Sequence, residues 1–113
     1  MKYLAVALLV ISSSISMAND LAKEFELIAK PLKGKIFMQY NNLLKSRPGV
    51  KGKVQFELKI SESGTLSTCT IKRTDLNAPD FEEKICNLYK SINYSSISIK
   101  PSSFVYEQQF LSM

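Results

Sequence analysis

The sequence of 113 residues contains no histidine and no tryptophan, and it has only four glycines, four prolines and two cysteines. The absence of histidine excludes Ser-His-Asp and Cys-His nucleophilic catalysis, every histidine-containing zinc site and the usual proton carrier near neutral pH. The low glycine and proline content argues against a disordered or collagen-like chain. We therefore expect a single small domain that is not an enzyme and holds no metal and no cofactor.

The charged residues do not indicate a nucleic-acid or catalytic site. Fifteen Lys and Arg oppose ten Asp and Glu, which gives a formal charge of +5. Because the cations are scattered along the sequence and never form a run, we expect a solvated cationic surface and no nucleic-acid binding. Glu82 and Glu83 are the paired carboxylates of a predicted helix, but neighbours one apart point in different directions. We expect them to form a solvated first turn.

The N-terminus has the order of features that is typical of a secretory signal peptide. Lys2 precedes an apolar run at residues 3–11, and residues 12–18 are small and polar. The apolar run is too short to span a membrane, where about 20 residues are needed. The pattern predicts that residues 1–18 are removed on export to the periplasm or the medium, so that Asn19 begins the mature chain. The alternative is a buried N-terminal helix.

Export changes the interpretation of the two cysteines, Cys69 and Cys86. An even number of cysteines in a small exported chain favours a structural disulfide. A redox-active pair would normally have the CxxC spacing, which is absent. Two thiols without histidine give at most half of a zinc site. We therefore expect a Cys69–Cys86 disulfide.

Two helices are expected at the start of the mature chain. Residues 20–30 have apolar residues at helical spacing, and Asp20 is a possible N-cap. Pro31 and Gly34 should end or kink this helix. A second helix is expected over residues 35–45. Both are expected to pack on the core and not to form binding surfaces.

The clearest pattern in the sequence is a strand. Residues 53–60 (KVQFELKI) alternate strictly between apolar and polar, as in a half-buried antiparallel strand. Residues 61–64 have turn composition, and residues 65–73 are rich in threonine, so the chain should return as the second strand of a hairpin. Cys69 and Ile71 would then point inward.

The C-terminal half completes an α+β fold. A loop at residues 77–80 should lead into an amphipathic helix over residues 81–92, and residues 104–111 (FVYEQQFL) should form a third strand. The predicted architecture is a two-layer sandwich of order ααββαβ, in which helices cover one face of a three-stranded antiparallel sheet. Phe104, Tyr106 and Phe110 alternate on one face of the last strand, with Gln108 as the exception.

The hairpin resembles TonB C-terminal-like domains of the AgmX/PglI C-terminal type. Residues 48–66 are similar to that family's P-x-x-x-G-K-V-x-V-x-F-x-I-x-x-x-G-x-V stretch, residues 71–76 to its x-x-S-S-x-L segment, and Ile85-Cys86 to a pair on its helix. The resemblance covers residues 33–111. It implies a TonB C-terminal-like domain at residues 33–113, preceded by an N-terminal helix at residues 19–32.

The resemblance also implies a protein-binding role, because family members add a partner's strand to the sheet edge. It implies a periplasmic binding module, or an accessory subunit of an envelope or transport complex. The partner would be a protein or peptide of the cell envelope, or a second copy of the chain. The implied binding residues lie on the last strand: Phe104, Tyr106, Gln108 and Phe110.

The chain departs from the family in two features, and these departures argue against energy transduction. Residues 92–95 (INYS) replace its W-x-F/Y-P run. The chain is also expected to lack the uncleaved membrane anchor and the proline-rich spacer of a TonB-type transducer. The alternative function is a soluble secreted inhibitor or immunity protein against a toxin or an enzyme, since small size, export and a disulfide suit that role as well.

Overall fold

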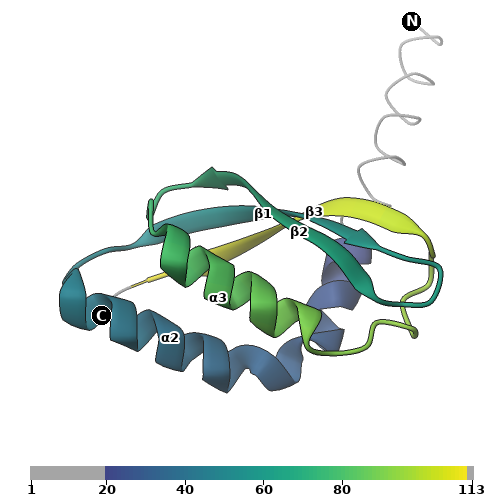
Figure 1. Cartoon of the computed structure of the whole chain (residues 1–113), viewed down its shortest axis with the longest axis horizontal. Coiled ribbons are helices and arrows are strands. Elements are labelled where there is room, and N and C mark those ends of the chain that lie inside the picture. Colours follow the sequence, from purple (N-terminus) through teal and green to yellow (C-terminus); the bar gives the residue numbers. More distant parts are fainter. Residues whose placement is uncertain (1–19, 112–113) are drawn as a thin grey trace, which may run out of the picture.

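The structure, a computed structural model, describes residues 20–111. The predicted signal peptide, residues 1–18, lies outside the described residues. Residues 20–28 are helical, and Figure 1 shows the elements that follow: η1 (Lys30–Leu32), α2 (Lys33–Ser46), β1 (Gly52–Ile60), β2 (Leu66–Thr74), α3 (Pro79–Lys90) and β3 (Ser102–Phe110). This order confirms the predicted α+β fold.

Strand β1 lies at the centre of the sheet. The strand order is β2-β1-β3, and both pairings are antiparallel. The alternation of β1 predicts its two faces correctly: Val54, Phe56, Leu58 and Ile60 point inward and are at most 1% exposed. The polar residues between them lie on the opposite, solvated face of the sheet.

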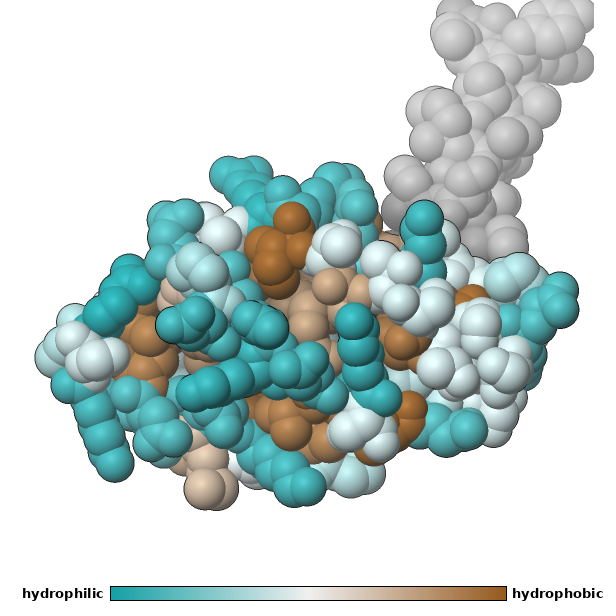
Figure 2. Space-filling view, in the orientation of Figure 1, coloured by the Kyte–Doolittle hydropathy of each residue, from teal (hydrophilic) through white to brown (hydrophobic). Residues whose placement is uncertain are grey.

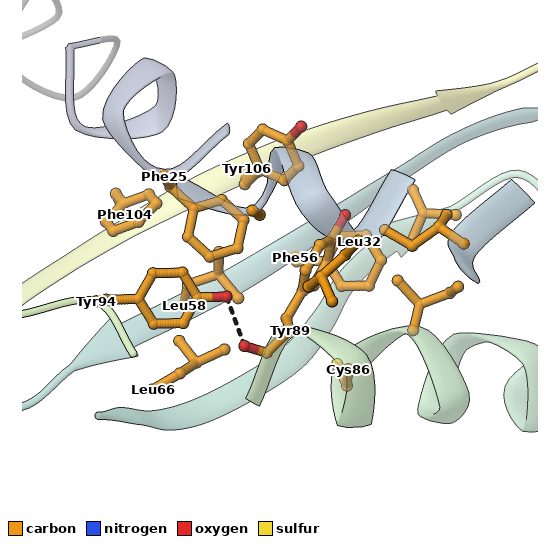
Figure 3. Close-up of a cluster of buried hydrophobic side chains, with 14 of the residues drawn as sticks. Phe25, Leu32, Phe56, Leu58, Leu66, Cys86, Tyr89, Tyr94, Phe104 and Tyr106 are labelled. Carbon is orange, nitrogen blue, oxygen red and sulfur yellow. Dashed lines mark hydrogen bonds between the residues drawn. The ribbon is translucent and has the colours of Figure 1, made fainter. Parts of the chain in front are cut away.

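The helices cover only the inner face of this sheet. Figure 1 shows α2, α3 and the helical residues 20–28 on the same side of the three strands. Phe25 is completely buried there, and its ring lies 4.9–5.8 Å from four other aromatic rings, from α3, the loop after it and β3 (Figure 3): Tyr89, Tyr94, Phe104 and Tyr106. Each such pair contributes about 0.5–1.5 kcal/mol beyond the burial of its area.

The break between the first two helices differs in detail from the prediction. Asp20, expected as a cap, is itself helical, and Gly34 lies in the first turn of α2 instead of ending a helix. Pro31, which lies in the short 3-10 turn η1, accounts for the break, because proline has no N–H to continue the hydrogen bonds of the preceding helix. Proline is tolerated in a first turn because its missing N–H has no intrahelical partner there.

The turn between β1 and β2 packs against the loop that follows α3. Gly64 has a φ of +86°, and a Cβ atom at this position would lie 2.5 Å from the backbone of Ser95. The N–H of Tyr94 donates a 2.8 Å hydrogen bond to the carbonyl oxygen of Gly64. Glycine is therefore required both for the left-handed backbone and for the close approach.

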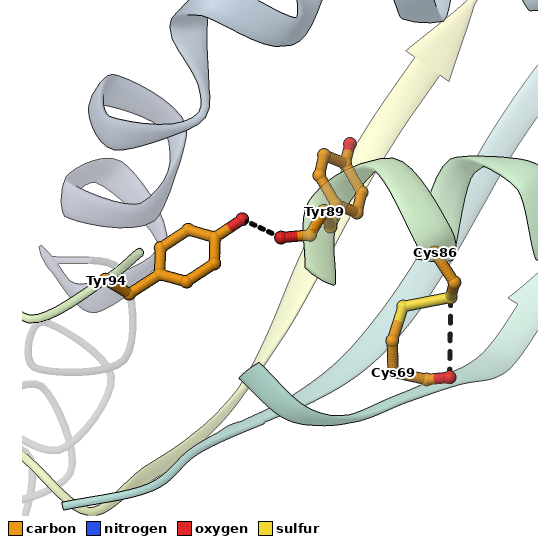
Figure 4. Close-up of a disulfide and its surroundings, with 4 residues drawn as sticks. All are labelled: Cys69, Cys86, Tyr89 and Tyr94. Carbon is orange, nitrogen blue, oxygen red and sulfur yellow. Dashed lines mark hydrogen bonds between the residues drawn. A yellow bond between two sulfur atoms is a disulfide. The ribbon is translucent and has the colours of Figure 1, made fainter. Parts of the chain in front are cut away.

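A disulfide joins the sheet to the helix layer, as predicted. Cys69 on β2 pairs with the inward-facing Leu58 in the sheet register, and it is bonded to Cys86 on α3 with a Cα–Cα distance of 5.7 Å (Figure 4). Ile71 also pairs with an inward-facing residue of β1 and is half-buried, as expected. The covalent link fixes β2 against α3.

Removing this disulfide should destabilise the fold without changing it. The two cysteines are 17 residues apart, and a loop of this size raises stability by about 3 kcal/mol by restricting the unfolded chain. We expect the double variant Cys69→Ser, Cys86→Ser to lose about this free energy of unfolding, measured by urea denaturation. A reducing agent should lower the stability of the parent protein and leave that of the double variant unchanged. Equal stability of the two proteins without reductant would contradict the prediction.

The buried tyrosines predict a loss of stability at alkaline pH. Burial raises the pKa of Tyr89 and of Tyr94 far above the usual value, and burial followed by the charge of Glu26 raises the pKa of Tyr106 to about 12. In the unfolded chain these phenols ionise near pH 10. Their contribution to stability is therefore complete below pH 10 and is lost as the pH rises toward 12 and beyond.

The free energy of unfolding at a series of pH values, with tyrosinate absorbance as a second signal, measures this effect. Tyr89→Phe is the informative variant, because the hydroxyl of Tyr89 has no hydrogen-bond partner among the described residues. The variant should keep its stability at neutral pH and lose less of it above pH 10. If both proteins lose the same free energy of unfolding above pH 10, Tyr89 does not contribute to the alkaline loss of stability.

Candidate functional site

A three-stranded sheet has two edges, which here are β2 and β3. An edge strand leaves every second N–H and C=O group without a partner in the sheet, so an extended peptide can pair with it. The two edges differ in regularity, charge and covalent attachment. These differences indicate which of them is open to a partner.

The β2 edge has features that protect an edge from pairing. Its register with β1 shifts twice, between Gln55 and Phe56 and between Lys59 and Ile60. The exposed pair Lys72-Arg73 places two positive charges on the strand. Irregular pairing and lysine or arginine side chains are common means by which proteins discourage strand addition.

The β3 edge has none of these features. It pairs with β1 over nine successive residues, from Gly52 opposite Phe110 to Ile60 opposite Ser102, without a register shift. Its sequence (SSFVYEQQF) contains no Lys, Arg or Pro. Among residues 20–111, no backbone–backbone hydrogen bond links β3 to any element other than β1. Within the described residues, this strand is therefore a regular template whose outward backbone groups form no hydrogen bond to the backbone of another element.

The structure places the predicted binding residues mostly in the core. Phe104, Tyr106 and Phe110 point inward and are 4–8% exposed. Gln108 is half-buried and accepts a 3.3 Å hydrogen bond from the hydroxyl of Tyr106. Three of the four side chains are thus occupied by packing, so a partner at this edge would pair with the β3 backbone.

The outward face of β3 is solvated and weakly paired. Glu107 accepts a 3.1 Å hydrogen bond from the side chain of Gln55 and lies 3.8 Å from the Nζ atom of Lys53. These groups are exposed, and such pairs contribute little to stability. The exposed side chains of Val105 and Gln109 flank Glu107 on the same strand. Among the described residues, the side chains on this face are therefore held only by weak surface contacts.

An apolar groove opens beside the C-terminal end of β3, between this strand and the first half of α2. Its volume is about 500 Å³. Phe37 and Leu111, 63% and 61% exposed, present apolar surface in it. The remaining lining residues come from the same two segments: Lys33, Gly34, Ile36, Tyr40, Gln108, Gln109 and Phe110. The sequence predicted no binding surface on α2, although Phe37 lies outside the apolar stripe of that helix.

Lys33, which lines this groove, belongs to a stretch of the sequence that carries only positive charges. Between Glu26 and Glu57 the sequence has no acidic residue. The interval contains only cationic charges: Lys30, Lys33, Lys35, Lys45, Arg47, Lys51 and Lys53. The cations are separated along the sequence, as noted above, but no carboxylate is interspersed with them. Lys33 therefore gives the groove a positive charge that suits a negatively charged partner.

Glu82 is buried, whereas the sequence predicted that it would lie in a solvated first turn. It is 5% exposed, and its carboxylate accepts hydrogen bonds of 2.7 Å from the hydroxyl of Thr74 and 3.1 Å from the N–H of Ala78. These bonds join the end of β2 to the start of α3. The prediction is wrong because the chain folds back at residues 74–78 and supplies donors that helix periodicity does not reveal. Glu83 is exposed as expected.

The described part of the chain shows no cluster of three or more residues able to hold a metal ion. None of the helices within residues 20–111 is long and apolar enough to cross a membrane. Figure 2 shows apolar side chains on the viewed face as separate patches between hydrophilic ones.

No protein-family model, curated protein or solved structure matches the chain. The similarity to TonB C-terminal-like domains therefore stays a prediction from the residues quoted above.

Amide hydrogen exchange tests whether the β3 edge is free. In an antiparallel pair, alternate residues of an edge strand donate to the neighbouring strand and the others point outward. We expect alternate amides along Ser102–Phe110 to exchange at least about tenfold faster than their neighbours, while those of the central strand β1 are all protected. NMR-detected exchange on the isolated protein measures this, and uniform protection along β3 would show that the edge is covered.

Proposed function

We propose that this protein is a binding module of the bacterial envelope that accepts an extended segment of a partner protein as a fourth strand beside β3. The observation that carries the proposal is the difference between the two edges. The β3 edge is regular over nine residue pairs and has no cation, whereas the β2 edge has two register shifts and exposed Lys72 and Arg73. Main-chain hydrogen bonds would supply affinity, and neighbouring pockets would supply specificity.

Two features support an extracytoplasmic location for this module. The disulfide between Cys69 and Cys86 is of a kind that persists in oxidising compartments. The predicted signal peptide at residues 1–18 is consistent with export to the periplasm. A small domain with a free strand edge in this compartment suits an accessory subunit of an envelope or transport complex, as the resemblance to TonB C-terminal-like domains also implies.

Site-specific photocrosslinking in intact cells tests the proposal. A photoreactive amino acid replaces Gln109 on β3, and in a matched control it replaces Thr70 on β2; both residues are exposed and lie on edge strands. We expect a defined adduct from position 109 and none from position 70, since only β3 would pair with the partner. Mass spectrometry of the adduct identifies the partner and the crosslinked segment.

The outcomes of this experiment are distinct. Equal adducts from both positions, or none from position 109, would contradict strand addition at β3. An adduct in which two copies of the chain are joined through position 109 would identify the partner as a second copy. A crosslinked segment that is helical in its own protein would also contradict the proposed mode of binding.

A further inference from the structure

We propose that the groove between α2 and β3 selects the partner, and that it binds an extended segment in which an apolar residue is accompanied by Asp or Glu. This inference rests on the proposed function, because it assigns the chemistry of the segment that adds to β3. The groove supplies an apolar surface, and Lys33 in its lining supplies the preference for acid.

Strand geometry places partner side chains in the groove. Successive side chains of an added strand alternate between the two faces of the sheet, so every second one points toward the helix layer. Near Gln108–Leu111, side chains do not fill the space between the β3 edge and the helix layer. A groove opens there instead. An inward-pointing side chain of the partner would therefore meet Ile36, Phe37 and Tyr40 of α2.

Phe37 is the residue best suited to hold an apolar side chain. It is 63% exposed in the free protein although it is a large aromatic, and it lines the groove. Met38 is the next residue on the same helix and is equally exposed, but it does not line the groove. Aromatic residues that become buried in a pocket on binding commonly dominate the affinity of an interface.

The charge of the groove favours an acidic segment over a second copy of this chain. Lys33 lines the groove, and the stretch between Glu26 and Glu57 holds seven cations and no carboxylate. A second copy would present β3, whose single acidic residue, Glu107, already lies beside Lys53. It would also bring a further net positive charge to a groove that already carries Lys33.

Synthetic peptides with one core and three kinds of flank provide the test. The labelled probes are EEVTFTVEE, SSVTFTVSS and KKVTFTVKK, in which the alternating core suits strand addition and the flanks change only the charge. We expect fluorescence anisotropy to show that the glutamate-flanked peptide binds at least about tenfold more tightly than the lysine-flanked one, with the serine-flanked peptide between them. The difference should shrink as salt is added.

Two pairs of substitutions locate the site. Phe37→Ser should weaken binding of the glutamate-flanked peptide about tenfold or more, whereas the control Met38→Ser should leave it unchanged. Lys33→Glu should weaken it about three- to tenfold and strengthen the lysine-flanked peptide, and Lys35→Glu, outside the groove, should have a smaller effect. Lys33 begins α2, where an acidic residue is favourable to the helix, so this variant should fold.

Several results would overturn the inference. These are equal affinity for the three peptides, binding of none of them at millimolar concentration, and equal losses from the variants at positions 37 and 38. Binding to vesicles of anionic lipid that depends on Phe37 and Met38 alike, in place of peptide binding, would assign the surface to a membrane. If the serine- and glutamate-flanked peptides bind equally and slow amide exchange along β3, the proposed function stands and only the acidic preference fails.

Discussion

The burial of one face of β1 is the constraint on which the rest of the structure depends. Its four inward side chains are almost completely removed from water, while the residues between them stay solvated. Because each is worth about 1.5–3 kcal/mol when buried, the chain must cover this one face and leave the other open. The helices, the aromatic cluster around Phe25 and the disulfide to Cys86 all lie on the covered side (Figures 3 and 4). The sheet formed by the described residues also has two edges, β2 and β3, each paired to β1 on one side.

Much of this fold could be predicted because its determinants are local. Strict alternation identified β1 and its inward residues, and an even number of cysteines in an exported chain identified the bond between Cys69 and Cys86. The helix break at Pro31 was also predicted from a local rule, although a 3-10 turn moved its position. In each case a pattern within a few residues, or the pairing of two cysteines, is enough to predict the structure.

The candidate site could not be predicted in the same way, because it depends on contacts between distant segments. The sequence predicts the last strand, but it does not reveal that Phe104, Tyr106 and Phe110 are packed in the core, which leaves the backbone of the strand as the part a partner could contact. The regularity of β3 appears only in its register with β1. The groove needs α2 and the end of β3 to lie side by side, and the hydrogen bonds of Glu82 need the chain to fold back. No local periodicity encodes these distances.

The inequality of the two edges has a consequence for stoichiometry. A sheet with two open edges can grow from both sides, which is how strand addition leads to polymers. In the proposed mode of binding, the register shifts and cations of β2 would discourage pairing on one side, and a strand would add at β3 alone. The domain would then be monovalent: it would form one-to-one complexes and would not link partners into chains. A monovalent module marks or caps a partner segment, whereas a bivalent one would bridge two.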